Sequence, residues 1–419
     1  MSSSSRAMAA FRHRDYRIFW AGGLISNSGT WLQSLTVPFV LFQITGSALW
    51  VGLAAVAQFL PMVLLSPLGG SLADRRSRRR VLLATQSGMA LTALGLLITW
   101  VSGVRSPVVL LAFLVIGGVI NGINLPSWQA FVSDLVPRDD LLSAVTLNSL
   151  QFNGARAIGP AIAGVVIALF GPAWAFGLNA ASFVFVLVAL LLVRGRVHVP
   201  SVNTDGVFRQ FRAALGYARS EPGLLLTFLV SGLLGGLGNP VFAFTVVFAG
   251  AVYLVGPAAL GFLNVAPGVG AVMAAPIVSR RGTSALSGTV RWAMVVYGLG
   301  ITVFGASTSY VVGMVALVFV GGAFLAGISS VNTSLQLFVD ERFRGRVMAV
   351  RLMVFTLSVS VGGLVQGWVA DHVGPHATVV TAGLLMVGFG VVIGRLRGRY
   401  SLSRLDGPAL TGASGTRAA

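Results

Sequence analysis

The chain has 419 residues, of which 55% are hydrophobic and only 10% are charged. Because about a quarter of the residues of a soluble domain are charged, a chain of this length and composition cannot cover a surface that faces water, and we expect it to lie in a lipid bilayer. The formal net charge of +18 would suit nucleic-acid binding if it were spread over a soluble surface. Here the charges gather between apolar runs, which indicates membrane topology instead.

Twelve apolar segments follow one another along the chain, each close to the roughly 20 residues that a spanning helix needs. We expect them near residues 17–43, 50–72, 81–102, 107–134, 141–169, 172–194, 222–250, 254–279, 288–306, 309–337, 345–370 and 375–396. The links within each half are short, so neighbouring helices are predicted to be antiparallel. The predicted fold is an all-α integral membrane protein with twelve transmembrane helices.

The basic residues predict how these helices are oriented. All 29 of them are arginine, and with a cytoplasmic N-terminus Arg105 lies in an outside link, Arg156 lies within a span and the other 27 lie in cytoplasmic segments. Because positive residues concentrate in cytoplasmic loops, this bias predicts that both termini are cytoplasmic. The chain is therefore expected to be a multi-pass protein of the cytoplasmic (inner) membrane.

A polar stretch divides the chain into two halves. We expect an N-terminal six-helix half (1–194), a cytoplasmic linker (195–221), a C-terminal six-helix half (222–396) and a flexible cytoplasmic tail (397–419). IGPAIAGVVIALFGPAW, which begins at Ile158, aligns without gaps with VGGLVQGWVADHVGPHA, which begins at Val361. Two parallel halves that rock around a site near the midplane are what an alternating-access transporter needs. The alternative is chance similarity between glycine-rich helices, in which small residues favour close packing.

The loop between the second and third predicted spans reads GGSLADRRSRRR, from Gly69 to Arg80. It resembles the signature G-x-L-A-D-R-x-G-R-R of the major facilitator superfamily, with Ser77 in place of the usual glycine. ARAIGPAIAG, which begins at Ala155, resembles the Gly-Pro motif of exporters in this superfamily. The N-terminal FRHRDYRIFWAGGLISNSGTWLQSL is similar to the branch of drug:proton antiporters that contains macrolide and siderophore (enterobactin-type) exporters. The resemblance covers the whole chain and implies the major facilitator fold.

The resemblance also implies a gate on the cytoplasmic side. In the family, the loop aspartate lies against the N-terminal end of span 11, where the helix dipole is positive, and the arginine four residues later pairs with an acid at the end of span 4. Asp74, Arg78 and Asp134 match these positions. The predicted gating residues are Gly70, Asp74, Arg75, Arg78 and Asp134, with Gly159 and Pro160 at a kink in span 5. The alternative for the arginines of the loop is that they only fix topology.

Polar side chains within the spans predict a substrate site, because they are costly in lipid and tend to face a cavity. Helices 1, 4, 7 and 10 line the cavity in the superfamily. The candidates fall on these helices: Asn27, Trp31 and Gln33, then Asn121, Asn124 and Trp128, which share one helix face, then Asn239, and finally Asn332 and Gln336. The alternative is hydrogen bonding between helices, at about 0.6 kcal/mol each, without substrate contact.

Arg156 lies about midway along span 5, where an arginine costs about 2.5–3.5 kcal/mol on insertion scales. No acidic residue lies near it in the sequence. It is expected either to bind an anionic group of the substrate or to hydrogen-bond carbonyls beside Gly159 and Pro160.

The eleven acidic residues all lie outside the spans or at their ends. Proton antiport usually needs a carboxylate or histidine that both substrate and proton can reach. Asp134 at the inner end, with Asp371 and His372 at the outer end, are the candidates, and none is at the midplane. Proton coupling is therefore implied by the resemblance alone.

These patterns predict an alternating-access exporter of an amphipathic organic molecule, with proton antiport as the implied energy source. The alternatives are an importer or facilitator of a small nutrient, and a lipid flippase or transporter-like sensor. The sequence has no catalytic constellation, no metal-ligand cluster and no cysteine, so neither an enzyme nor a cofactor is predicted. The expected partners are a small-molecule substrate, the bilayer and, with antiport, protons; we expect a monomer that binds no nucleic acid.

Overall fold

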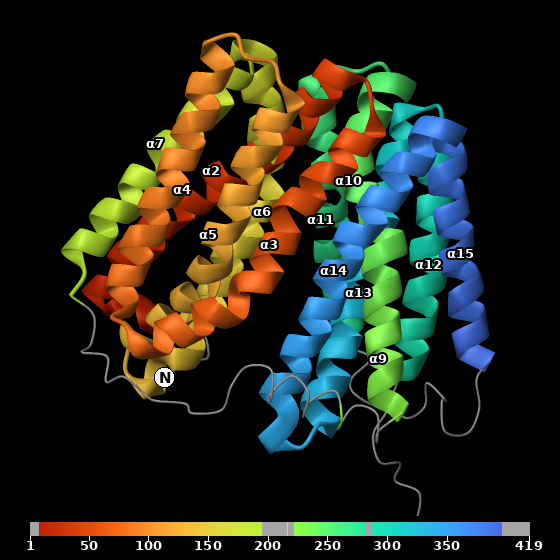
Figure 1. Ribbon diagram of the computed structural model, residues 1–419. Helices are drawn as coiled ribbons and strands as arrows, with labels where there is room; N and C mark the ends of the chain where they lie inside the picture. Colours follow the sequence, from red (N-terminus) through yellow and green to blue (C-terminus); the bar gives the residue numbers. More distant parts are fainter. Residues whose placement is uncertain (1–7, 195–215, 217–221, 281–285, 396–419) are drawn as a thin grey trace, which may run out of the picture. The chain divides into compact units, whose positions relative to one another are not determined.

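The structure is a computed structural model that describes residues 8–194, 216, 222–280 and 286–395, and within these ranges it is helical, without a β-strand (Figure 1). The predicted linker 195–221, apart from residue 216, and the predicted tail 397–419 lie outside the described residues. The chain begins with η1 (Ala9–Arg12), α2 (Arg14–Thr45), α3 (Ala48–Arg75), α4 (Arg78–Val101), α5 (Pro107–Asp134), η2 (Arg138–Asp140), α6 (Leu141–Phe170) and α7 (Pro172–Leu192). It continues with α9 (Pro222–Leu233), η3 (Leu234–Gly238), α10 (Pro240–Val247), η4 (Phe248–Val252), α11 (Pro257–Arg280), α12 (Leu286–Ala306), α13 (Tyr310–Phe338), α14 (Glu341–Val373) and α15 (Pro375–Arg395).

Each predicted span coincides with a helical segment to within a few residues. The seventh span is not one regular helix. The π-helical turn η3 joins α9 to α10, and a second π-helical turn, η4, follows α10. Among the described residues, eleven helical segments are long and apolar enough to cross a membrane. The remaining predicted span, α2, is long enough with 32 residues, but serine, asparagine, glutamine and threonine interrupt its apolar sequence.

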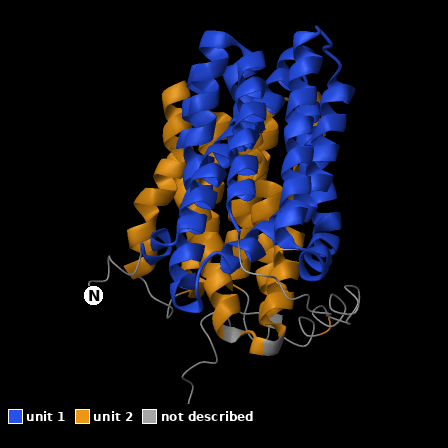
Figure 2. Ribbon diagram, turned by 90° about the vertical axis from the view of Figure 1, so that its left-hand side faces the viewer, with its two compact units in different colours: residues 1–204, 245–265 blue, residues 205–244, 266–419 orange. Residues whose placement is uncertain are grey.

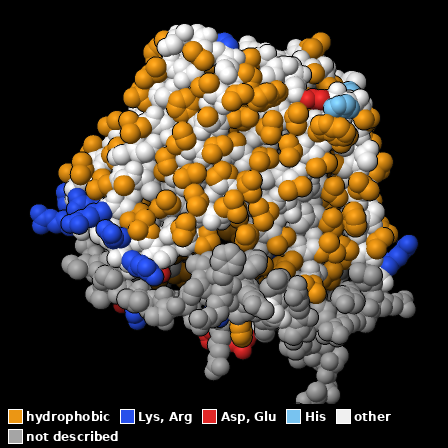
Figure 3. Space-filling model, in the orientation of Figure 1, with side chains coloured by type: hydrophobic (Ala, Val, Ile, Leu, Met, Phe, Trp, Pro, Cys, Tyr) orange, Lys and Arg blue, Asp and Glu red, His pale blue; other side chains and the backbone are white. Residues whose placement is uncertain are grey.

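The outward surface of the helices is apolar. Large hydrophobic side chains such as Leu91, Val108 and Leu169 are 65–69% exposed. On the face drawn in Figure 3, hydrophobic side chains spread widely over the surface, whereas charged side chains lie mainly along its edges. A surface of this kind is stable in contact with lipid chains rather than with water.

The chain divides into two compact units, drawn in blue and orange in Figure 2: unit 1 is Met1–Thr204 with Thr245–Val265, and unit 2 is Asp205–Phe244 with Ala266–Ala419. In unit 1, α3 packs along α5, α2 packs against α6 and α7, and α4 packs against α5 and α7. In unit 2, α12 packs against α13 and α15, and α14 packs against α9 and η3. Because residues 245–265 pack with unit 1, these units differ from the two predicted six-helix halves, whose separate roles stay a prediction.

The aligned segments of the predicted repeat have similar local geometry. Gly171 and Gly374 each have a positive φ, of 84° and 98°, a conformation that glycine adopts at little cost. Each is followed by a proline at the start of a helix, which suits the fixed φ of that residue. The turns from α6 to α7 and from α14 to α15 are therefore alike, as the alignment predicts.

Gly69 sets how closely α3 approaches α5. A Cβ at this position would lie 2.5 Å from the carbonyl oxygen of Gly122 and 2.7 Å from Cα of Ile123, whereas a Cβ at Gly70 would meet nothing within 4 Å. We expect Gly69→Val to lower the melting temperature of the purified protein by about 4 °C or more, because the clash is with backbone. Gly70→Val is the matched control, and an equal loss in both variants would contradict this account.

Candidate functional site

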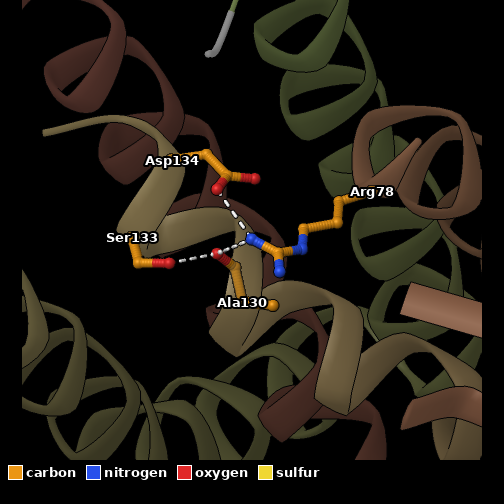
Figure 4. Close-up of polar contacts among 4 residues, drawn as sticks. All are labelled: Arg78, Ala130, Ser133 and Asp134. Carbon is orange, nitrogen blue, oxygen red and sulfur yellow. Dashed lines mark hydrogen bonds and ion pairs between the residues drawn. The ribbon is translucent and has the colours of Figure 1, made fainter. Parts of the chain in front are cut away.

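The start of α4 is joined to the end of α5 by an ion pair (Figure 4). Arg78 Nη1 lies 2.7 Å from Asp134 Oδ1 and donates a longer hydrogen bond, of 3.3 Å, to the carbonyl oxygen of Ala130. The same carbonyl accepts a hydrogen bond from Ser133 Oγ. The side chains of the ion pair are 17% and 15% exposed, so solvent screens them less than it screens a surface pair. The predicted Arg78–Asp134 pairing is present, and its role in gating stays a prediction.

The adjacent arginine has a structural role that the sequence did not predict. Arg79 Nε and Nη2 donate hydrogen bonds of 2.6 and 2.8 Å to the carbonyl oxygens of Leu190 and Leu191, in the last turn of α7. Basic side chains commonly satisfy the free carbonyls at a helix C-terminus. Asp74 is half-buried and Arg75 is exposed; their gating roles, like that of Gly70, stay predictions.

We expect the ion pair to hold the α3–α4 corner against α5. Arg78→Ala and Asp134→Ala should each lower the melting temperature, because each leaves a largely buried charge without its partner. The double variant should lose little more than the worse single variant, since the second substitution removes that stranded charge. Thermal unfolding of the four purified proteins measures this, and strictly additive losses would show that the two charges do not interact.

An aromatic and cationic cluster lies where α2 meets α6. The guanidinium carbon of Arg156 is 5.5 Å from the ring centroid of Trp31, within the range of a cation–π contact. Phe152, one turn before Arg156, meets the same indole edge to face at 5.6 Å. Both α6 side chains are exposed, and Asn27, one turn before Trp31, is half-buried. The structure therefore brings two predicted residues together and adds Phe152, which the i, i+4 spacing to Arg156 could have indicated.

The glycines of the Gly-Pro motif allow close helix contacts in unit 1. A Cβ at Gly159 would lie 2.5 Å from Trp31 Cβ, and one at Gly164 would lie 2.5 Å from the carbonyl oxygen of Pro257. A Cβ at Gly261 would lie 3.0 Å from the carbonyl oxygen of Pro160. The motif thus fits α6 against α2 on one side and against the start of α11 on another, while the gating role of Gly159 and Pro160 stays a prediction.

Two of the three polar candidates on α5 take part in helix packing. Asn124 is 7% exposed, and its Oδ1 accepts hydrogen bonds from Thr85 Oγ1 at 2.9 Å and from Gln86 Nε2 at 3.1 Å. Trp128 is 8% exposed, and its Nε1 donates to Asn148 Oδ1 at 3.0 Å. These contacts favour the packing alternative for both residues.

The other polar candidates of unit 1 are less enclosed. Asn121 is half-buried and its Nδ2 lies 3.4 Å from Met62 Sδ. Gln33 is half-buried and its Oε1 accepts a 2.6 Å hydrogen bond from Asn179 Nδ2 on α7. The bond orients Gln33, and substrate contact by either residue stays a prediction.

The candidates in unit 2 are half-buried or exposed. Asn239, directly after η3, and Asn332 on α13 are half-buried, and Gln336, one turn after Asn332, is exposed. The buried Oδ1 of Asn332 has no hydrogen-bond partner among the described residues. Substrate contact by all three residues stays a prediction.

Arg351 is a candidate that the sequence assigned only to topology. It is 6% exposed, and its buried Nε and Nη1 have no hydrogen-bond partner among the described residues. It lies one turn before Phe355, on the side of α14 that packs closely on Gly235 of η3. On that side of the packing, Ser231 Oγ is likewise buried without a described partner. A buried cation without a described acceptor is costly in a membrane helix, so a functional role for Arg351 is a hypothesis to be tested.

The three candidate residues for proton coupling lie at the ends of helices. Asp134 is engaged by Arg78, while Asp371 and His372 are exposed at the end of α14, where His372 Nδ1 lies 2.8 Å from the carbonyl oxygen of Trp368. Within the ranges that the structure describes, no group of three or more histidines or acids could hold a metal ion. Proton coupling through these groups stays a prediction.

Comparison with known proteins identifies the family. Residues 5–406 match the family model described as "Transmembrane secretion effector". The chain belongs to this family of major facilitator superfamily transporters. It is therefore a multi-pass transporter of the inner membrane rather than an enzyme. The loop motif and the Gly-Pro motif implied a transporter of the major facilitator superfamily, and that prediction is confirmed.

Relatives resemble the chain over most of its length. The uncharacterized MFS-type transporter YfiS of Bacillus subtilis (strain 168) is 26% identical over 395 residues, which cover 89% of this chain and 90% of YfiS. The enterobactin exporter EntS of Salmonella typhi is 26% identical over 399 residues, which cover 92% of this chain and 94% of EntS. The predicted resemblance to siderophore exporters is confirmed at this level.

Solved structures share the fold. A D-xylose–proton symporter has a TM-score of 0.71 at 13% identity and covers 92% of this chain and 98% of its own. A bacterial homologue of the human lysosomal transporter Spinster, in an inward-facing and occupied conformation, has a TM-score of 0.72 at 12% identity. The match covers 93% of this chain and 96% of the homologue. The major facilitator fold is thus confirmed.

Proposed function

We propose that this transporter exports an amphipathic organic molecule, such as a drug, a macrolide-like compound or a siderophore, across the cytoplasmic membrane by alternating access. The observation that carries the proposal is the cluster of Trp31, Phe152 and Arg156. Two aromatic faces and a permanent cation are presented by adjacent helices, and an exposed arginine of this kind binds carboxylate or another anionic group well. The relation to EntS, whose name states enterobactin export, supports the same direction and class of cargo.

The charge of the cluster restricts the cargo. From Tyr16 to the end of α2, and throughout α6, the sequence contains no aspartate or glutamate, so neither of the two helices that form the cluster offers a counter-ion to a cationic drug. Rings stack on Trp31 and Phe152 in offset or edge-to-face geometry. The preferred cargo is therefore aromatic or otherwise apolar, with a neutral or anionic polar part.

Proton antiport is the energy source that we propose for export. Its candidate groups, Asp134, Asp371 and His372, lie at the ends of helices rather than beside Arg156. A proton taken up by Asp134 would weaken the Arg78–Asp134 pair, which would couple protonation to the α3–α4 corner instead of to direct competition with the cargo.

A ligand screen by thermal shift tests the cargo class. The full chain, purified in detergent, is heated with enterobactin, with a macrolide and with an aromatic quaternary ammonium compound. A ligand that binds the folded state raises the melting temperature, and the rise grows with the ratio of its free concentration to its dissociation constant. We expect a rise with the anionic or neutral compounds that is lost in Arg156→Gln. A rise with the cationic compound alone would contradict the proposal.

A further inference from the structure

A cavity of about 390 Å³ lies where α3 ends and α4 begins, with α5 as its third wall. Most of its lining is apolar and comes from Leu72, Val81, Ala84, Ile120 and Ile123. Its volume is within the range of small-ligand pockets. All of its lining residues belong to unit 1, and neither Trp31 nor Arg156 is among them, so the cavity is distinct from the aromatic cluster.

Two arginines of the loop motif line this cavity. Arg76 and Arg80 are exposed, and the side chain of neither makes a hydrogen bond or ion pair with another described residue. Their neighbours in the loop are used differently, because Arg78 pairs with Asp134 and Arg79 caps α7. The basic run therefore serves two purposes, and the cations that packing does not use are those that line the cavity.

The lining of the cavity continues along one stripe of α4. Ser77, Arg80, Val81 and Ala84 all line it, and their i, i+3, i+4 and i+7 spacing places them on one helix face. Along this face, the charged side chain of Arg80 is therefore followed by the apolar side chains of Val81 and Ala84. A ligand that fits this cavity must carry an anionic group next to an apolar part.

The start of α4 strengthens the attraction for an anion. Its N-cap residue, Ser77, makes no side-chain capping bond, and its first turn holds no acidic residue. The first amide groups of a helix and its dipole both favour negative charge. No aspartate or glutamate lines the cavity, so the charged side chains in its lining are the two arginines.

We propose that this cavity binds an anionic phospholipid, with the phosphate between Arg76 and Arg80 and the first part of an acyl chain along the apolar wall. The arginines stand at the end of the helices that the charge bias predicts to be cytoplasmic, where we expect the lipid headgroups to lie. Basic pockets between membrane helices at this level bind anionic headgroups. A free phosphate would match only the rim, whereas a phospholipid matches both the rim and the wall.

Binding of defined lipids by the delipidated full chain tests this site. The protein in detergent is titrated with dioleoylphosphatidylglycerol, dioleoylphosphatidylcholine and glycerol 3-phosphate, and the shift of the melting temperature gives the apparent affinity. We expect phosphatidylglycerol to bind best. The double variant Arg76→Gln/Arg80→Gln should lower its apparent affinity by about tenfold or more, and Ala84→Phe, which fills the cavity without changing the charge, should also lower it.

A charge-matched control separates this site from general attraction. Arg17 and Arg138 are exposed and lie outside the cavity lining, so Arg17→Gln/Arg138→Gln should bind phosphatidylglycerol like the unmodified chain. Arg76→Lys/Arg80→Lys should retain binding and shows that the loop folds when these positions are changed. Equal weakening in the control, equal shifts with phosphatidylcholine, or an equal shift with glycerol 3-phosphate would each overturn the proposal.

Discussion

Arg156→Gln is expected to lower the rate of export by about tenfold or more, which corresponds to about 1.4 kcal/mol of lost interaction with the cargo. The physical reason is that the cluster would keep the rings of Trp31 and Phe152 but lose its cation. Arg156→Lys keeps the charge but loses the planar group that stacks on an indole. Its export rate should therefore lie between those of the unmodified protein and Arg156→Gln. Cells that express each variant at an equal level in the membrane are assayed for efflux of the compound found by thermal shift.

Two further variants make this result specific. Trp31→Leu should reduce export of aromatic cargo more than that of aliphatic cargo of the same charge, because the ring contact is lost and the arginine remains. Arg138→Gln, in the exposed turn η2, removes one positive charge away from the cluster and should leave export unchanged. Efflux that is unchanged in Arg156→Gln would remove this residue from the site.

Arg351→Met is expected to raise the melting temperature by about 2 °C or more while transport falls at least about fivefold. Replacing a buried cation that lacks acceptors with an apolar side chain of similar length relieves its desolvation cost, since Nε and Nη1 have no described partner. Proteins keep a destabilising buried charge of this kind where transport or another function needs it.

Arg346→Met is the matched control on the same helix. Arg346 is half-buried, and its guanidinium carbon lies 6.0 Å from the ring centroid of Phe343. Because this side chain is less buried than that of Arg351, its replacement should not stabilise the protein. A lower melting temperature in Arg351→Met would show that the guanidinium is satisfied in the folded state. A higher melting temperature with normal transport would assign Arg351 to topology alone.

The spans could be predicted closely because their signal is local. Apolar runs of about 20 residues and the glycines and prolines between them fix the helix ends, as at the link from Phe170 to Pro172. The Arg78–Asp134 pair could be predicted because the family resemblance implies that the loop arginine pairs with an acid at the end of span 4. The π-helical turn η3 could not be predicted, since the glycine-rich sequence before Asn239 is equally compatible with a regular helix. The sequence of η4, FAGAV, is likewise compatible with a regular helix.

The candidate site could be predicted only in part, because periodicity tells which residues share a face but not what that face meets. Asn121, Asn124 and Trp128 do share a face of α5, yet Asn124 meets Thr85 and Gln86 on α4. The burial of Arg351 likewise depends on the packing of α14 against η3, which is far away in the sequence. Contacts between distant segments decide these points, and a single sequence does not contain them.

Transport by membrane vesicles of known orientation tests the central claim most directly. Inside-out and right-side-out vesicles that contain the protein are given the labelled cargo, with and without a proton gradient, and Arg156→Gln vesicles serve as the control. Export predicts accumulation in inside-out vesicles that depends on Arg156. Accumulation in right-side-out vesicles only, or movement of labelled lipid without movement of any cargo, would contradict it.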